Sequence, residues 1–421
     1  MRYSNYYLTL GALLVFATLE ILCQIYWLQH YDRGAITLYY MLFGLMVGFL
    51  PLWKVKRPPA AAGPSSRIVW TVLTIALLCF SYQTIVISSG MMARIPVDYR
   101  LADMLPIMQI MSQRYVNGEE VYDIIPEIWG GMQPIYLPAM WMPYIPSVTW
   151  HFDPRWVTVF FLLTSSVLIL LWPPARKRLS WCSLLVLIPM FFLFRTFLLW
   201  DFQMISLTDE GVVIGFYVFL AWAIWFGNPW VLGIALALSI LSRVSYLNWI
   251  PFYAIFVWVF ESRRKALITA GTAITIGLFL MVVSQAIFHL EVFLALPKRY
   301  LEAMMDPQHY QNSLEKISAT QGFAKFFRQE YFPLLLTSSY VTTIGAPLLC
   351  LLAFRRLRHR MDANFFGLAT LKITLVFFFN LIIMPQSNLF YTSGFLSLAI
   401  LAFYAQTGRV NKEHPVLPES T

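Results

Sequence analysis

A carboxylate stands directly after a strong apolar span, at the point where a long polar loop begins. Asp98, in the run Pro96-Val97-Asp98-Tyr99-Arg100, opens a segment of mixed charge and aromatic residues that ends near Tyr144. A carboxylate within hydrogen-bond reach of a hydroxyl group can take its proton, which is the task of a general base. At the edge of a membrane such a residue could meet a lipid-linked substrate and a polar acceptor together. The loop is therefore the first candidate for chemistry in this chain.

Composition identifies the kind of scaffold that must position this loop. Of the 421 residues, 59% are hydrophobic and 12% are charged, and the mean hydropathy is +0.65. A soluble domain carries about 25% charged residues, whereas apolar runs of about 20 residues can cross a bilayer. The sequence predicts an all-α polytopic membrane protein. The net charge of +9 then reports topology and contact with membrane lipids, and it does not indicate a nucleic-acid partner.

The apolar runs predict about ten full spans and one broken helical hairpin. The run 231–260 is too long for one upright helix, and it is interrupted at Ser242-Arg243 and again at Asn248–Pro251. This pattern predicts two half-length helices that meet inside the membrane, beside a protein-lined or wet cavity. The full spans are expected at about 8–28, 35–53, 68–90, 156–173, 181–199, 211–226, 266–289, 331–354, 363–384 and 389–405.

Basic clusters predict the orientation. Lys54–Arg57, Arg176–Arg178, Arg263–Lys265 and Arg355–Arg358 all fall on one side of the predicted spans, and most acidic residues fall on the other. The positive-inside rule places the basic side and both termini on the cytoplasmic side of the plasma (inner) membrane. Two long loops, about 91–155 and 290–330, then lie on the outer (periplasmic or extracytoplasmic) face. We expect an N-terminal hairpin with a cytoplasmic linker (1–67), a main transmembrane domain (68–406) and a cytoplasmic tail (407–421).

Both outer loops are expected to carry interfacial helices. Met104–Tyr115 has apolar residues at helical spacing and predicts a helix on the membrane surface. Pro134–Pro138 predicts a stiff return segment, and Phe323–Phe332 has the composition of an interfacial segment.

Common catalytic signatures are absent from the sequence. It has no Walker loop, no HExxH, no nucleophile elbow and no CxxC pair, and its six histidines are scattered. The four cysteines lie far apart in apolar stretches, so we expect buried thiols and neither a disulfide nor a zinc site. These absences argue against a nucleotide-driven pump and a zinc protease.

The order of several short phrases resembles the GT-C glycosyltransferases, most of all the family 87 polyprenyl-phosphate-mannose-dependent mannosyltransferases. The resemblance covers roughly residues 68 to 405, and each phrase is short. Arg243 stands where the family leads us to expect Lys, and the hairpin before residue 54 is an addition. The phrases are Asp98, Asn117–Tyr122, Pro134–Pro138, Trp200–Gln203, the broken hairpin with Arg243 at its bend, and Pro385–Asn388 before Tyr391.

This resemblance implies a GT-C-type bundle that moves one sugar, mannose or another hexose, from a polyprenyl-phosphate donor to a lipid or glycan acceptor of the cell envelope, with inversion. It implies Asp98 as the general base and no cofactor. No metal ligands are assigned, because metal dependence varies across the superfamily. The candidate substrate-binding residues are Tyr99, Asp103, Tyr136, Asp201, Gln203, Arg243, Lys298, Arg299, His309, Lys372, Gln386, Asn388 and Tyr391.

The candidates also have structural interpretations. Asp98 could cap the helix that follows it, and Asp201 and the pair Asp209-Glu210 could cap or anchor helix ends. Arg243 and Lys372 lie within apolar runs, where charge is rare and usually functional, yet both could belong to internal ion pairs, Lys372 with Glu20 or another acid. Lys298, Arg299 and His309 could form a solvated face.

Two other function classes stay open. A secondary transporter or a lipid-linked glycan flippase fits the broken hairpin and the intramembrane charges equally well, although the sequence has no visible inverted repeat and this class does not require a long ordered outer loop. A polysaccharide ligase or polymerase using undecaprenyl diphosphate would rely on an Arg and His pair in a late outer loop, as Arg299 and His309 offer.

Overall fold

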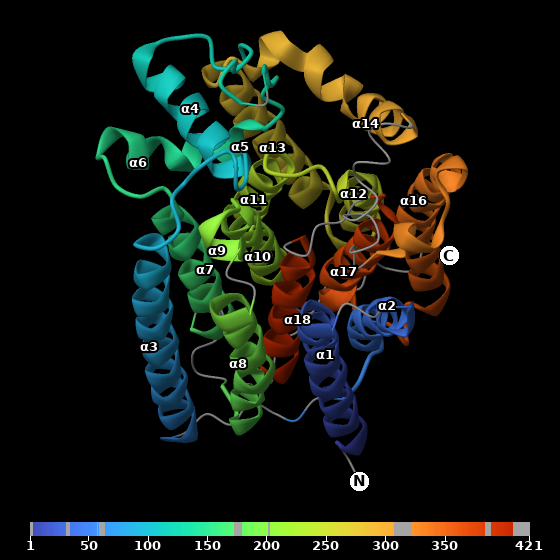
Figure 1. Cartoon of the computed structure of the whole chain (residues 1–421). Coiled ribbons are helices and arrows are strands. Elements are labelled where there is room, and N and C mark those ends of the chain that lie inside the picture. The colour runs from blue at the N-terminus through green and yellow to red at the C-terminus, as the bar shows by residue number, and fades with distance from the viewer. Residues whose placement is uncertain are drawn as a thin grey trace.

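The computed structural model describes residues 3–30, 34–56, 58, 64–128, 130–171, 179–200, 203–306, 322–383 and 389–406, and helices dominate this part of the chain (Figure 1). The described residues contain no strand, only two isolated bridges. Seven helical segments are long and apolar enough to cross a membrane, which confirms an all-α membrane protein. They are α1 (Ser4–His30), α2 (Gly34–Phe49), α3 (Pro64–Met92), the segment Trp181–Leu199 around α8 (Leu187–Arg195), α13 (Arg263–Val283), α16 (Phe332–Leu357) and α17 (Ala363–Leu381).

Shorter apolar helices fill the centre of the bundle. They are α7 (Arg155–Leu170), α10 (Glu210–Phe226), α11 (Pro229–Ile240), α12 (Ile250–Phe256) and α18 (Leu389–Ala405). Most side chains of α10 and α18 are buried on all sides, as expected for a helix that is apolar all round. These helices fall short of the length of a full span, so the ten full spans expected from hydropathy are not all full-length helices.

The broken hairpin has the predicted form. Helix α11 ends at Ile240, an irregular bend follows, and the chain turns back through Leu247–Trp249 into α12 and a π-helical turn, Val257–Glu261. Pro251 lies in the first turn of α12, where its missing N–H costs nothing. Another predicted span, 181–199, is instead three pieces, a 3₁₀ segment, α8 and a π-helical turn. Pro189 lacks the N–H that would bond to the carbonyl of Leu185, so a regular α-helix cannot continue there.

Basic residues gather at one end of the bundle, here called the basic end, with Lys54, Arg263 and Arg358. A short bridge pairs Trp53 with Met361, and the Arg358 guanidinium lies 5.9 Å from the Phe260 ring. The N-terminus of α1 also contacts the C-terminus of α18, because the Tyr6 hydroxyl donates to the carbonyl of Ala405 at 3.2 Å. This grouping agrees with the predicted alternation of the spans.

The two long loops lie together at the opposite end, here called the loop end (Figure 1). The first contains α4 (Met104–Asn117), α5 (Pro138–Trp141) and α6 (Ile145–Thr149), and the second contains α14 (Leu290–Met305). The helix expected at Met104–Tyr115 is therefore confirmed. The two loops are joined, because His289 Nε2 contacts Glu120 Oε1 at 2.7 Å and the Val121 N–H donates to Gln285 Oε1 at 3.0 Å.

One helix boundary and the burial of the cysteines differ from the sequence-based expectation. Helix α13 stops at Val283, before the expected position 289, because Gln285 has a φ of +66°, which ends a right-handed helix. The cysteines are free as expected, but Cys79 is exposed on α3 and only Cys350 is fully buried.

Candidate functional site

A buried ion pair joins the first residue of α10 to the bend of the hairpin. Arg243 Nη1 donates to Glu210 Oε2 at 2.9 Å, and Nη2 donates to Glu210 Oε1. The Glu210 side chain is completely buried and that of Arg243 is 18% exposed. Helices α10 and α11 run antiparallel, with the Ser239 hydroxyl donating to the carbonyl of Phe216, and this brings the two residues level. Of the two interpretations of Arg243, the structure contains the internal ion pair.

Close packing places this pair at the loop end. An added Cβ at Gly211 would lie 2.6 Å from Thr158 Cγ2, and one at Gly215 would lie 2.3 Å from the Phe161 ring. Gly211 lies against Thr158 and Gly215 lies against Phe161, so the contacts advance in the same direction along both helices, and α7 and α10 run parallel. The start of α10 therefore lies beside the start of α7, which is the helix that follows the first long loop.

Asp209 is the unusual member of this cluster. Its side chain is completely buried, and neither carboxylate oxygen has a hydrogen-bond partner among the described residues. It precedes α10 but does not cap it through its side chain. Burial, and then the charge of Glu210, raise the pKa of Asp209 to about 7. A buried carboxylate without a partner is costly to keep, so such a group calls for an explanation.

The first long loop packs next to the cluster. The Tyr144 hydroxyl contacts Thr158 Oγ1 at 3.2 Å, and the Thr158 hydroxyl lies 3.3 Å from the carbonyl of Thr208, the neighbour of Asp209. On the hairpin side, the Ala139 N–H of α5 donates to the carbonyl of Leu241 at 3.0 Å. The loop is thus bonded to α7, and to the hairpin two residues before Arg243.

Two predicted site residues come close to Asp209. Burial raises the pKa of Tyr136 well above its ordinary value, and the negative charges of Asp209 and then Asp103 act in the same direction. Tyr136 is half-buried, and the interaction between charges weakens as their distance grows. Asp103 occupies the N-cap position of α4 without a side-chain cap bond. We call Asp209, Glu210 and Arg243 the acidic cluster; Asp103 and Tyr136 interact with it electrostatically.

Asp98 lies in a tight turn before α4. Its Oδ1 accepts from the backbone N–H of Arg100 at 2.9 Å, and its carbonyl accepts from Leu101 at 3.0 Å. It therefore closes a turn and does not cap α4, because Asp103 holds that position. The side chain is partly exposed. Next to it, Tyr99 faces the Arg100 guanidinium at 5.9 Å.

A buried arginine holds the start of this loop in place. Arg155, at the beginning of α7, donates to the carbonyl of Ile95 at 2.6 Å and to that of Met92 at 3.1 Å. The same guanidinium forms an ion pair with Asp153, and the distance from Nη2 to Oδ2 is 2.5 Å. The carbonyls at the end of α3 thereby gain a cationic partner, which is favourable at a helix C-terminus. This clamp fixes the backbone three residues before Asp98.

Lys372 belongs to a separate buried network. Its Nζ donates to Glu20 Oε1 at 2.6 Å and to the carbonyl and the hydroxyl of Ser393 at 2.8 and 2.6 Å. The Ser397 hydroxyl donates to Glu20 Oε2 at 2.6 Å. All three ammonium protons are used, so the structure contains the Glu20 pair rather than a free cation for a donor. Nearby, Tyr391 is buried against the Phe197 ring.

The remaining candidates are dispersed or lie outside the described residues. Lys298 and Arg299 are exposed on α14, where Lys298 lies 3.6 Å from Glu302. Gln203 begins α9 (Gln203–Ser206), and its side chain is not described. Asp201, His309, Gln386 and Asn388 lie outside the described residues.

Sequence reasoning treated Asp209 and Glu210 as helix ends and left them out of the candidate site. One signal could have found them. Two adjacent carboxylates begin a helix that is otherwise apolar, and a single arginine interrupts the next apolar run. Ionisable residues at membrane depth are expected to find a partner of opposite charge. Two acids and one base leave one carboxylate over, which is what the structure contains.

No protein-family model matches this chain, and a comparison with curated protein sequences also finds no match.

Proposed function

We propose that the chain is a membrane glycosyltransferase that moves a sugar from a polyprenyl-phosphate donor to an acceptor at the loop end of the bundle, with inversion. One observation carries the proposal. The first outer loop is a folded layer of three helices that is hydrogen-bonded to the hairpin beside a buried acidic cluster, and Asp98 lies in that layer. Transfer between a lipid and a polar acceptor needs such a platform above a membrane bundle, and a transporter does not.

The chemistry assigns different tasks to the charged groups. Asp98 accepts the proton of the acceptor hydroxyl, whose oxygen bonds to the anomeric carbon of the sugar. The bond between that carbon and the phosphate oxygen breaks, and its electron pair leaves with the polyprenyl phosphate. Positive charge near this phosphate lowers the barrier. Glu210 uses two of the five N–H donors of Arg243, so three remain for a phosphate oxygen.

Sidedness belongs to the same proposal. We place the loop end on the outer face of the plasma membrane and the basic end in the cytoplasm, because the positive-inside rule assigns the basic end there. The acceptor is then a lipid or glycan of the cell envelope, and the transferred sugar is mannose or another hexose.

A second candidate, a proton-coupled transporter or lipid-linked glycan flippase, is favoured by Asp209. A buried carboxyl whose pKa is raised to about 7 can bind and release a proton at neutral pH, and such groups mark proton relays in transporters. The broken hairpin beside it also suits that class. The ligase alternative has less support, since Arg299 is exposed on α14 and His309 lies outside the described residues.

The test uses purified protein in proteoliposomes and radiolabelled polyprenyl-phosphate sugars. The proposal expects a labelled product with at least one donor and no added nucleotide. The same vesicles, loaded with a pH-sensitive dye, measure proton movement on addition of lipid-linked glycan. Proton movement without any sugar transfer would favour the transporter. Transfer only from a diphosphate-linked glycan would favour the ligase.

A further inference from the structure

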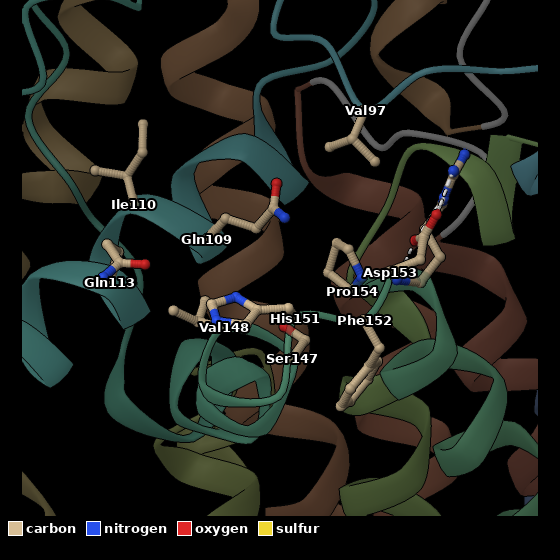
Figure 2. Close-up of a pocket in the computed structure, with 11 residues that line it drawn as sticks. Val97, Gln109, Ile110, Gln113, Ser147, Val148, His151, Phe152, Asp153 and Pro154 are labelled. Carbon is tan, nitrogen blue, oxygen red and sulfur yellow. Dashed lines mark hydrogen bonds and ion pairs between the residues drawn. The ribbon is translucent and has the colours of Figure 1, made fainter.

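A polar cavity lies in the first outer loop, and its lining contains no member of the acidic cluster. Its volume is about 590 Å³, and it opens between α4 and the chain that joins α6 to α7. Figure 2 shows Gln109 and Gln113 on the α4 side, with Ser147, Val148 and His151 facing them. Val97, the residue before Asp98, also contributes to its wall. The cavity therefore adjoins the proposed base.

The lining of this cavity has a definite chemical character. Neutral hydrogen-bonding side chains come from Gln109, Gln113, Ser147 and, in its neutral form, His151. The lining's carboxylate, Asp153, is neutralised by Arg155. A strongly anionic or cationic ligand would find no counter-charge here. A neutral ligand rich in hydroxyl groups would find amide, hydroxyl and imidazole partners, and the exposed part of Phe152 for an apolar ring face.

Several of these groups are available to a ligand. Gln109 and His151 have no hydrogen-bond partner within the described parts of the chain. Gln113 donates to Asn117 at 2.9 Å through its amide nitrogen, which leaves its amide oxygen. The Ser147 hydroxyl donates to the carbonyl of Tyr144 at 2.6 Å, which leaves its lone pairs. The cavity thus offers both donors and acceptors, as a sugar requires.

The walls are held rigidly. Arg155 ties the end of α3 to the start of α7 on one side. His151 has a φ of +55°, a left-handed conformation that few residues other than glycine adopt. Side chains held in such backbone conformations cluster at functional sites.

We propose that this cavity is the acceptor subsite and binds an uncharged, hydroxyl-rich glycan, presenting one of its hydroxyl groups to Asp98. The inference rests on the proposed function, because it assigns the substrate class of the same reaction. It adds that the acceptor is recognised through a neutral carbohydrate portion, and not through a phosphate or an amine.

The test pairs two cavity variants with a matched control. Gln109→Leu keeps the size of the side chain and removes its hydrogen bonds. His151→Gly removes the imidazole and suits the left-handed backbone. The control, Thr149→Val, lies on α6 outside the cavity lining, with its hydroxyl bonded only to Ile145 of its own helix. Each cavity variant should raise the acceptor KM about tenfold, as for one lost hydrogen bond to a ligand, with kcat and the donor KM within about twofold of the parent.

A binding measurement separates this inference from the proposed function. Saturation-transfer NMR on protein in a sugar-free detergent uses maltose as the neutral probe and glucuronate as the anionic comparison. We expect saturation of maltose by the parent and the Thr149→Val protein, and its loss in both cavity variants.

Equal saturation in all proteins, none in the parent, or stronger saturation of glucuronate would contradict the acceptor subsite. If the cavity variants are active and their acceptor KM is unchanged, the acceptor subsite is contradicted and the proposed function stands. Loss of maltose saturation in the variants, in a protein that transfers no sugar from any donor, would remove the proposed function and keep the binding site.

Discussion

Two buried ionic sites in this molecule use similar residues in opposite ways. Around Lys372, one acid meets one base, and Ser393 and Ser397 satisfy the remaining atoms. In the acidic cluster, two adjacent acids meet one base, and Asp209 is left without a hydrogen-bond partner in the described structure. A fully satisfied network specifies packing, whereas a buried polar group left over is expected where function requires it. The comparison separates a structural site from a candidate working site.

The largest effect is expected at the satisfied pair. Lys372→Met removes the ammonium and leaves Glu20 buried without its counter-charge, which should lower the free energy of unfolding by about 3–5 kcal/mol. Thermal unfolding in detergent measures this loss. The double variant Glu20→Gln with Lys372→Met should recover most of it, because no charge is then left buried. A single variant as stable as the parent would show that the pair does not hold α1 to α17.

Asp209→Asn should behave in the opposite way. It removes a buried charge that has no partner, so stability should hold or rise by about 1 kcal/mol. Stability should also change with pH. The pKa of Asp209 is raised from 3.8 to about 7 in the folded protein, so the folded state binds more protons than the unfolded state between these values. Stability contributed by the proton is therefore full below pH 4 and lost as the pH rises through 7.

Thermal unfolding between pH 5 and pH 8 tests this difference. The parent should lose stability across that range, and Asp209→Asn should lose less. The matched control is Asp153→Asn. The Asp153 carboxylate pairs with Arg155, so this variant should be less stable than the parent. Destabilisation of Asp209→Asn by more than the control would mean that Asp209 has a structural partner after all.

The smallest effect is expected at an exposed ion pair on α14, which contrasts with the two buried sites. Lys298 is 81% exposed and lies 3.6 Å from Glu302 on the same helix. Such a pair is worth about 0.5 kcal/mol or less. Lys298→Ala should therefore leave the unfolding temperature unchanged. A large fall in sugar transfer, with unchanged stability, would instead assign this lysine to the substrate.

Hydropathy and charge predicted much of this fold. The broken hairpin followed from an apolar run of wrong length with Arg243 inside it, and the helix after Asp103 followed from its apolar spacing. The pairing of Lys372 with Glu20 was one of the alternatives, because a charge at membrane depth needs a partner. These features depend on the local sequence, or on one strong pairwise requirement.

Other features depend on packing between distant segments. The burial of Asp209 accompanies the close packing of Gly211 against Thr158, which brings α10 against α7. The cavity forms between α4 and the chain that joins α6 to α7, with Gln109 on one side and His151 on the other. The clamp of Arg155 on Ile95 joins residues far apart in the chain. Spacing along the sequence carries no signal for any of these three arrangements.

The central claim is that Asp98 takes a proton during sugar transfer at the loop end. The most direct measurement is the initial rate of labelled sugar transfer by the parent, Asp98→Asn and Asp103→Asn, with saturating donor and acceptor. Loss of a positioned base lowers a rate by about 10²–10⁴-fold, so Asp98→Asn should fold, bind donor and transfer at least about a hundredfold more slowly. Asp103→Asn should be milder. Near-parent transfer by a well-folded Asp98→Asn protein would contradict the claim.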